Sequence, residues 1–151
     1  MPELDGKVAI VTGAGRLRGI GRAAAVAYAR LGADVVVTGT GRDPATFPDD
    51  EKAVNWRDVE STADEVRALG RRALTLTVDV SDQEQVQNMI DDTVAEFGRV
   101  DILVNNAAFA RGADRVPVAD LTPELFNLVV NIKVGGTFYC TKAFMAQITK
   151  Q

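Results

Sequence analysis

The chain has 151 residues, 46% of them hydrophobic and 25% charged, a composition typical of one globular domain with its own core. Its net charge of −4 argues against nucleic-acid binding, because phosphate backbones are held by surplus Lys and Arg. The absence of histidine and the single cysteine, Cys140, exclude Ser-His-Asp hydrolysis, an intrachain disulfide and a His-ligated zinc site, so we expect no metal.

The sequence also gives no sign of a membrane or secretory segment. No apolar run approaches the roughly 20 residues that cross a bilayer. Residues 1–6 are polar, and the apolar run that follows is too short for a signal peptide. We therefore expect a cytoplasmic protein that forms a single domain over residues 1–151 and has no membrane partner.

The first elements form a strand–helix–strand unit. Residues 7–12 (K-V-A-I-V-T) are a continuous β-branched run, typical of a strand that is covered on both faces. From Gly19 to Gly32 the apolar residues recur with a helical period. Residues 34–38 (D-V-V-V-T) are the next strand, and such a unit requires a right-handed parallel crossover.

The alternation of helix and strand then continues. We expect a helix capped by Asn55 or a neighbour, with an apolar stripe from Trp56 and an end at Gly70. Residues 73–78 are a third strand. Ser81 and Glu84 have the spacing of a capping box, with Ser81 as N-cap of a helix over residues 81–98.

A fourth strand at residues 101–105 precedes a long helix over residues 122–150, which begins with Thr122 as N-cap and Pro123 at the first position. Strands alternating with helices predict an α/β fold, a three-layer αβα Rossmann fold with a mainly parallel sheet. Segment 39–54 is the exception, because it has no convincing periodicity and exceeds the about 2–6 residues usual for such a connection. It is either a surface insertion or a flap over the adenosine end of a cofactor.

A glycine-rich loop, T-G-A-G-R-L-R-G-I-G, joins the first strand to the first helix. Its glycines let the backbone turn and approach a pyrophosphate, and the helix directs its N-terminal N–H groups toward that charge. No Gly-Lys-Ser/Thr follows, so the loop is not a P-loop. The predicted cofactor-binding residues of the loop are Thr12, Gly13, Gly15, Arg16, Arg18, Gly19, Ile20 and Gly21.

Further segments follow this loop in order: Asp79 with Val80, residues 105–108 (N-N-A-A), and Asn131 in the last helix. Together they resemble the short-chain dehydrogenase/reductase family over essentially the whole chain. Two departures are a phosphate loop two residues longer than that family's and a similarly longer run after Asn131.

The resemblance implies a role for each segment. Asp79 is implied to hydrogen-bond adenine with Val80 beside the ring, although Asp79 can also be read as a turn or helix-start residue. Asn105 is implied to tie the central strands together, and Asn131 to act in catalysis by holding a water of a proton relay. The residues implied to lie along the cofactor are Asn106, Ala107 and Ala108.

The end of the second strand bears on the choice of cofactor. It reads T-G-T-G-R, with no acidic residue to bind a ribose 2′-hydroxyl. Arg16, Arg18 and Arg42 are available for a 2′-phosphate, unless they are only solvated loop charges. We therefore expect NADP(H) to be favoured, with NAD(H) as the alternative, and add Thr40 and Arg42 to the cofactor-binding residues.

The resemblance implies an NAD(P)(H)-dependent oxidoreductase that transfers hydride between nicotinamide and a small-molecule carbonyl or alcohol substrate. The family's Ser and Tyr-x-x-x-Lys are expected beyond the last helix, so we expect this chain to be the cofactor-binding half, with the C-terminal part of the fold missing, and to be inactive alone. Tyr139 and Lys142 have the wrong spacing for that motif.

Two alternatives stay open: a catalytically inactive nucleotide-binding or interaction module, and a Rossmann methyltransferase. Helix 122–150 is apolar on more than one face. This favours a homo-oligomer, a dimer or tetramer, although packing against the missing half of the fold explains the same pattern.

Overall fold

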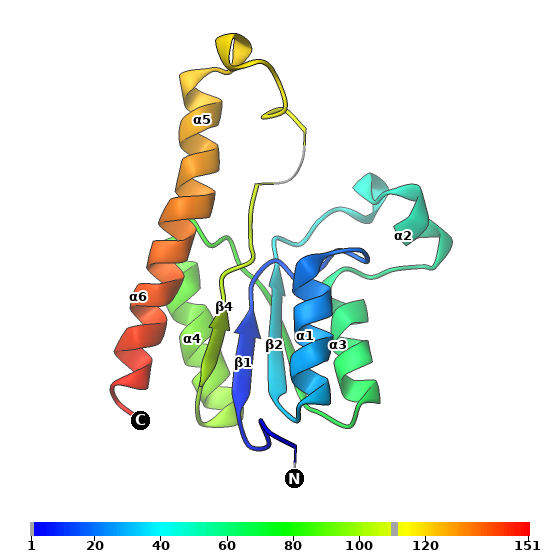
Figure 1. Ribbon diagram of the computed structural model, residues 1–151, viewed down its shortest axis with the longest axis vertical. Helices are drawn as coiled ribbons and strands as arrows, with labels where there is room; N and C mark the ends of the chain where they lie inside the picture. Colours follow the sequence, from blue (N-terminus) through cyan, green and yellow to red (C-terminus); the bar gives the residue numbers. More distant parts are fainter. Residues whose placement is uncertain (1, 110–111) are drawn as a thin grey trace.

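The computed structural model describes residues 2–109 and 112–151, which form a parallel sheet between two layers of helices (Figure 1). The strands are β1 (Val8–Val11), β2 (Asp34–Gly39), β3 (Ala73–Thr77) and β4 (Ile102–Val104). They lie in the order β3-β2-β1-β4, and all neighbouring pairs are parallel. The predicted three-layer αβα Rossmann fold is confirmed.

Each face of the sheet has its own hydrophobic core. Val8 and Ile10 pack in one core and Val11 in the other, because successive side chains of a strand point to opposite faces. Both faces are covered by helices, which is why these strands are continuous apolar runs rather than alternating ones.

The helices divide between the two faces (Figure 1). α1 (Ile20–Arg30) and α3 (Val59–Ala68) contribute to the core that contains Val11. α4 (Gln83–Phe97) and α6 (Gly136–Ile148) contribute to the core that contains Ile10. α4 ends at Gly98, whose φ of 80° is the left-handed conformation that glycine adopts without strain.

One predicted helix start is wrong because two residues before α3 leave the helical region of backbone space. Asn55 has a φ of 51° and Asp58 a φ of 54°, so a right-handed helix cannot pass through either. Asp58 is the N-cap of α3, and Trp56 lies in the connection before the helix rather than on its apolar stripe.

The predicted capping box at the start of α4 is also wrong. Asp82, not Ser81, is the N-cap, and its carboxylate accepts hydrogen bonds from the amides of Glu84 and Gln85. The Ser81 hydroxyl instead donates to Asp79 Oδ1 at 2.6 Å. Both residues are common caps, and only the backbone path distinguishes them.

Segment 39–54 contains two short helices that the sequence pattern did not predict. A 3₁₀ turn, η1 (Pro44–Thr46), is followed by α2 (Asp49–Ala53), which lies beyond the carboxyl end of β2 beside the start of α1 (Figure 1). A five-residue helix is less than two turns long, so it cannot show a helical period.

The last helical stretch begins as predicted, since the Thr122 hydroxyl caps α5 (Pro123–Val130) by accepting from the Leu125 amide. A π-helical turn, η3 (Asn131–Gly135), joins α5 to α6. The run after Asn131 is therefore a π-helical bulge within an otherwise α-helical stretch. η2 (Val118–Asp120) precedes α5, and no helix in the described part of the chain is long and apolar enough to cross a membrane.

Candidate functional site

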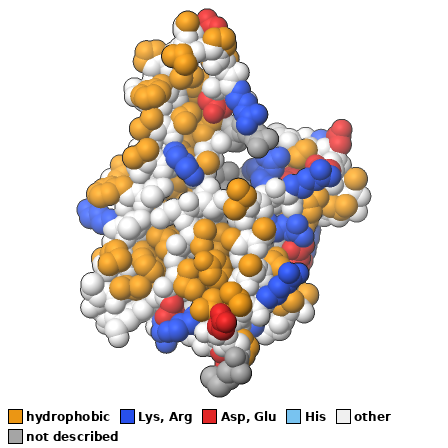
Figure 2. Space-filling model, in the orientation of Figure 1, with side chains coloured by type: hydrophobic (Ala, Val, Ile, Leu, Met, Phe, Trp, Pro, Cys, Tyr) orange, Lys and Arg blue, Asp and Glu red, His pale blue; other side chains and the backbone are white. Residues whose placement is uncertain are grey.

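A cavity of about 570 Å³ lies at the carboxyl ends of the strands. Figure 2 shows the surface hollowed between the α5 side and the α2 side, with basic side chains beside the hollow. β1 has β2 and β4 as its two neighbours, and this reversal of strand order is where open α/β sheets bind ligands. The cavity is lined by Gly13, Gly15, Arg16, Arg18, Gly19, Gly39, Thr40, Arg42, Pro48, Asp50, Glu51, Asp58, Val78, Asp79, Val80, Asn106, Ala107, Ala108 and Phe109.

Two glycines of the loop permit close backbone packing. Gly13 has a φ of 69°, and a Cβ there would lie 2.8 Å from the Ala107 Cα. A Cβ on Gly21 would lie 2.7 Å from the Gly13 carbonyl oxygen. Any side chain at these positions would therefore separate the loop from β4 or from α1.

Asn106 fixes the loop to the end of β4. Its Nδ2 donates to the carbonyls of Thr12 and Gly13, both at 2.9 Å, and its amide donates to the Thr12 hydroxyl at 3.1 Å. The role predicted for Asn105 is thus performed by Asn106, and that prediction is wrong. Asn105 Nδ2 instead donates to the Thr141 hydroxyl on α6.

The start of α1 lies near the cavity and has no side-chain cap among the described residues. Gly19, the N-cap, has no side chain to bond the first N–H groups, which have no partner within the helix. These groups and the helix dipole make this end a site for an anion. Gly19 lines the cavity, whereas Ile20 is 80% exposed and Gly21 packs beneath the loop, so these two predicted residues do not line it.

Thr12 is the third predicted loop residue that does not line the cavity, and it lies below the loop. Its hydroxyl donates to the Val104 carbonyl at 3.1 Å and accepts from the amides of Asn106 and Ala107. Thr12 therefore holds the ends of β1 and β4 together rather than facing a ligand.

Arg42 is paired with two carboxylates. Its Nε and Nη2 donate to Asp58 Oδ1 at 3.2 and 2.9 Å, and its Nη1 donates to Glu51 Oε2 at 3.0 Å. Arg42 also lies over the Phe47 ring, 4.5 Å from its centroid. The guanidinium is thus held on two carboxylates and an aromatic face.

The other two arginines are also paired with acids. Arg16 Nε donates to Glu51 Oε1 at 3.1 Å, and Arg18 Nε lies 2.9 Å from Asp50 Oδ2. Arg18 is mostly exposed, so its pair is weak. The sequence pattern did not indicate these pairs, because their acids come from α2 and from the start of α3; whether the arginines bind a 2′-phosphate stays a prediction.

Glu51 is the buried acid that joins α2 to the phosphate loop. Only 1% of the residue is exposed, and Oε1 accepts from the Leu17 amide at 3.0 Å as well as from Arg16. Burial raises the pKa of Glu51, but the Leu17 amide, Arg42 and Arg16 outweigh burial and hold the pKa below its ordinary value. Glu51 is therefore an anion enclosed by the loop.

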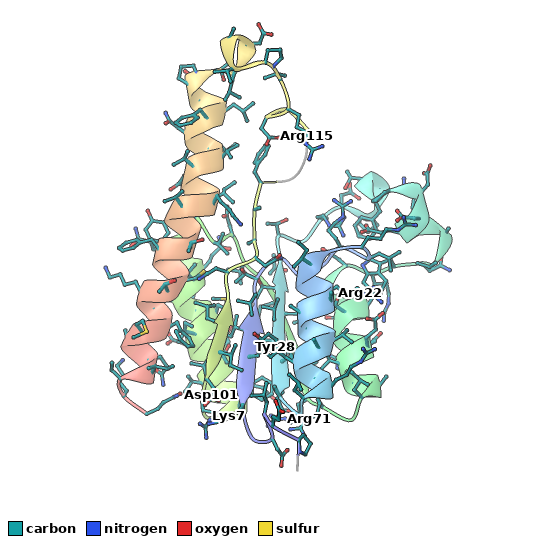
Figure 3. The ribbon with its side chains drawn as sticks, in the orientation of Figure 1. Lys7, Arg22, Tyr28, Arg71, Asp101 and Arg115 are labelled. Atoms are coloured by element: carbon teal, nitrogen blue, oxygen red, sulfur yellow. The ribbon has the colours of Figure 1, made fainter. Side chains whose placement is uncertain are left out.

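Trp56 and Arg22 support the same loop from the side of α1 and α3. The Trp56 indole donates to the Gly15 carbonyl at 2.6 Å. Arg22, labelled in Figure 3, donates to the Leu17 carbonyl at 2.9 Å and to both carboxylate oxygens of Glu65 on α3. Its guanidinium lies 5.4 Å from the Trp56 ring centroid. Segment 39–54 and the residues after it are thus bound to the loop, and the role of the segment as a flap over a cofactor stays a prediction.

Sequence reasoning missed Glu51 and Asp58 as residues of the site. The acidic run at residues 49–51 reads as a solvated face, and nothing in it marks which carboxylate is buried. The signal that could have found Glu51 is the complementary charge of an acidic insertion and a lengthened loop that contains two arginines.

Asp79 and Val80 lie at the far wall of the cavity. Asp79 Oδ1 accepts from the Ser81 amide and hydroxyl, so Asp79 is a turn residue and also lines the cavity. Val80 is 5% exposed, and a Cβ on Gly136 would lie 2.5 Å from its Cγ2. Val80 therefore connects the end of β3 with α6.

Asn131 lies apart from this group. It is the first residue of the π turn, it is exposed, and it is not among the described residues that line the cavity. Nearby, Lys133 Nζ donates to the Ala107 carbonyl at 3.5 Å. The catalytic role of Asn131 stays a prediction.

The parallel sheet, the glycine-rich loop and the uncapped helix end define a Rossmann-type α/β domain. The family model described as short chain dehydrogenase matches residues 7–151. The chain belongs to the short chain dehydrogenase family.

Curated relatives agree with this assignment. A short chain dehydrogenase/reductase of Aspergillus oryzae is 38% identical over 150 residues, covering 99% of this chain and 51% of the relative. The 2-dehydro-3-deoxy-D-gluconate 5-dehydrogenase of Dickeya dadantii is 34% identical over 149 residues, with coverage of 99% and 51%. The chain thus spans about half the length of these relatives.

Solved structures are similar as well. A short chain dehydrogenase from Mycobacterium paratuberculosis bound to NAD superposes with a TM-score of 0.80 at 33% identity, covering 98% of this chain and 52% of the other. An NAD⁺-bound xylitol dehydrogenase superposes with a TM-score of 0.81 at 32% identity, with coverage of 99% and 50%. The same sheet and helix arrangement therefore holds NAD in these neighbours.

Proposed function

We propose that the protein is an NAD(P)(H)-dependent oxidoreductase that transfers hydride between a nicotinamide cofactor and a small-molecule carbonyl or alcohol carbon. The observation that carries this proposal is the convergence of the glycine-rich loop, Asp79 and Asn106 on one cavity at the carboxyl ends of the strands. Relatives named as dehydrogenases of a sugar acid and of a hydroxysteroid support the reaction class.

The residues present fit a dinucleotide. A Cβ on Gly13 would lie 2.8 Å from the Ala107 Cα and one on Gly15 1.7 Å from Asp58 Oδ1, so only glycine lets the loop backbone form this wall of the cavity. The first amides of α1 have no partner within the helix. Ala107 and Ala108 line the cavity beside the loop, and their small side chains occupy little of its volume. Bound nicotinamide supplies hydride transfer.

Each wall of the cavity then has a task in binding. The loop amides and the start of α1 bind the diphosphate through Gly15, Arg16, Arg18 and Gly19. Asp79 and Val80 hold the adenine, with Thr40 and Arg42 at its ribose. Asn106, Ala107 and Ala108 orient the nicotinamide side. Outside the cavity lining, Asn131 is assigned the water used in proton transfer by the family resemblance alone.

The proton-transfer group is not evident in these 151 residues. The only tyrosines are Tyr28 and Tyr139, and neither is followed by Lys four positions later. We therefore infer that the chain binds and orients the cofactor and is inactive alone. The same observation favours the second candidate, a catalytically inactive nucleotide-binding or interaction module.

NADP(H) and NAD(H) make different demands on the site. NADP(H), which the sequence favours, needs Arg16, Arg18 or Arg42 to exchange a carboxylate for the 2′-phosphate. NAD(H) needs no exchange, and solved neighbours hold NAD. We therefore propose NAD(H) as the preferred cofactor and NADP(H) as the alternative.

A partner surface belongs to the proposal too. Phe126, Leu128, Val134, Phe138 and Met145 are exposed along α5, η3 and α6. An apolar surface of this kind supports a homo-oligomer, a dimer or tetramer, formed through residues 122–150. The cytoplasmic location stays a prediction.

Calorimetric titration with NADH, NADPH and S-adenosylmethionine tests the function. We expect a dinucleotide to bind and S-adenosylmethionine not to bind, and the reverse order overturns the proposal in favour of a methyltransferase. Hydride transfer is then followed by nicotinamide absorbance with a panel of carbonyl substrates. Dinucleotide binding without turnover by the protein in its native, full-length form supports the inactive module.

A further inference from the structure

The end of β2 lacks an acid in sequence, but the fold places one beside it. Asp58 lies at the start of α3, and its carboxylate approaches both the phosphate loop and β2. A Cβ on Gly15 would lie 1.7 Å from Asp58 Oδ1, and a Cβ on Gly39, the last residue of β2, 3.6 Å from Oδ2. The carboxylate therefore occupies the wall between loop and strand.

The backbone of Asp58 is held in an unfavourable conformation. Its φ of 54° with ψ of −131° lies where glycine is preferred. Residues kept in such conformations concentrate at ligand sites, where surrounding contacts enforce them. Here the enforcing contact is Arg42, which bonds Asp58 through both Nε and Nη2.

Only one oxygen of this carboxylate is used. Both bonds from Arg42 end on Oδ1, and within residues 2–109 and 112–151 no hydrogen bond ends on Oδ2. The Asp58 side chain is 12% exposed and belongs to the cavity wall. Oδ2 is thus the oxygen left to accept a hydrogen bond from a ligand.

The charges of the wall favour a donor over an anion at this position. The lining contains three guanidinium groups and four carboxylates. The carboxylates are Asp50, Glu51, Asp58 and Asp79. A 2′-phosphate would be repelled by these carboxylates, and the guanidinium groups are already paired with carboxylates. A 2′-hydroxyl can instead donate a hydrogen bond to a carboxylate.

We propose that Asp58 is the specificity-determining residue at the adenosine end of the cavity. It accepts a hydrogen bond from the ribose 2′-hydroxyl and excludes a 2′-phosphate, so that the site selects NAD(H) over NADP(H). Arg42 is a positioning residue, because it holds Asp58 and donates to the Gly15 carbonyl at 3.1 Å. This inference rests on the proposed nicotinamide-cofactor function.

Binding of NADH and of NADPH to the chain tests the assignment. Trp56 is the only tryptophan, and its indole bonds the loop, so quenching of its emission by the reduced nicotinamide reports binding. The variants are Asp58→Asn, which keeps the side-chain shape, and Asp58→Gly, which suits the positive φ if asparagine does not fold. Asp64→Asn on α3 is the matched control, because Asp64 is half exposed and outside the cavity lining.

We expect the native chain to bind NADH more tightly than NADPH, by about tenfold or more, the effect of one charge-assisted hydrogen bond. Asp58→Asn and Asp58→Gly should weaken NADH and strengthen NADPH so that the ratio falls toward one, and Asp64→Asn should leave the ratio unchanged. Arg42→Gln should weaken NADH and keep the preference.

Three results overturn the inference. They are tighter binding of NADPH by the native chain, an unchanged ratio in both Asp58 variants, and a loss of NADPH binding alone in Arg42→Gln. In each of these a dinucleotide still binds, so the proposed function survives. If neither dinucleotide binds the folded native chain, the proposed function fails together with the inference.

Discussion

Replacement of Glu51 by glutamine removes a buried charge while keeping the size of the side chain. Glu51 Oε1 accepts from Arg16 and from the Leu17 amide, and Oε2 accepts from Arg42. A glutamine has one acceptor oxygen and one NH₂ group. Whichever way it turns, an NH₂ group faces either Arg42 or the pair of Arg16 and the Leu17 amide, and donor then meets donor.

The structure sets the size of the effect on the free energy of unfolding. Breaking a buried ion pair by removing one partner costs about 3–5 kcal/mol. Arg16 is half exposed, so its share is reduced to about 1 kcal/mol or less. Arg42 retains Asp58 as a partner, which lowers the loss further. We therefore expect Glu51→Gln to lower the free energy of unfolding by about 2–4 kcal/mol.

Urea unfolding followed by far-UV circular dichroism and by Trp56 fluorescence measures this loss. Asp50→Asn is the control, because Asp50 is on the same helix but pairs with the mostly exposed Arg18. The control should lose less than about 1 kcal/mol. Equal losses in the two variants would refute the view that the enclosed Glu51 anion fixes α2 to the loop.

Three further results are expected. The native chain should be more stable than Glu51→Gln by the full amount above pH 4.5, the ordinary pKa of a glutamate, and this difference should decline as the pH falls through the lowered pKa of Glu51. Urea unfolding across acidic pH measures the difference, and a constant difference would contradict the prediction. Gly15→Ala should lower the free energy of unfolding, measured by heat or urea, by about 1–3 kcal/mol and should abolish NADH binding, because the new Cβ would collide with Asp58. Native-like binding by this variant would show that the loop is placed differently. Burial raises the pKa of the Cys140 thiol to about 11. Iodoacetamide should therefore alkylate the folded chain on the order of a hundredfold more slowly than the urea-unfolded chain. Equal rates would refute the burial of Cys140.

The strands and the phosphate loop could be predicted because their causes are local in sequence. A strand buried on both faces needs a continuous apolar run, and β1 and β2 each supply one. A backbone that approaches another backbone needs glycine, and Gly13 stands at such a place. Sequence therefore indicated both the sheet and the edge at which the cavity lies.

The acids of the cavity could not be predicted in the same way. Glu51 and Asp58 reach the loop through the path of residues 39–58, which depends on short helices and two residues with positive φ. Such conformations follow from tertiary contacts, not from the residue type alone. The same applies to Asp82, which replaces Ser81 as the cap of α4 although both have suitable side chains.

Two segments depart from the common pattern: the longer loop and the insertion after β2. The polar groups that one segment adds are bound by groups of the other. The extra loop residues bring the guanidinium of Arg16 and the amide of Leu17, and the insertion brings the carboxylate of Glu51 that binds both. The Leu17 amide is thereby occupied, while Gly13, Gly15 and Gly19 still line the cavity. The amide that the longer loop adds at Leu17 is therefore not available to a diphosphate. It is used within the protein, so the backbone donors of the binding surface are those of the glycines and of the start of α1.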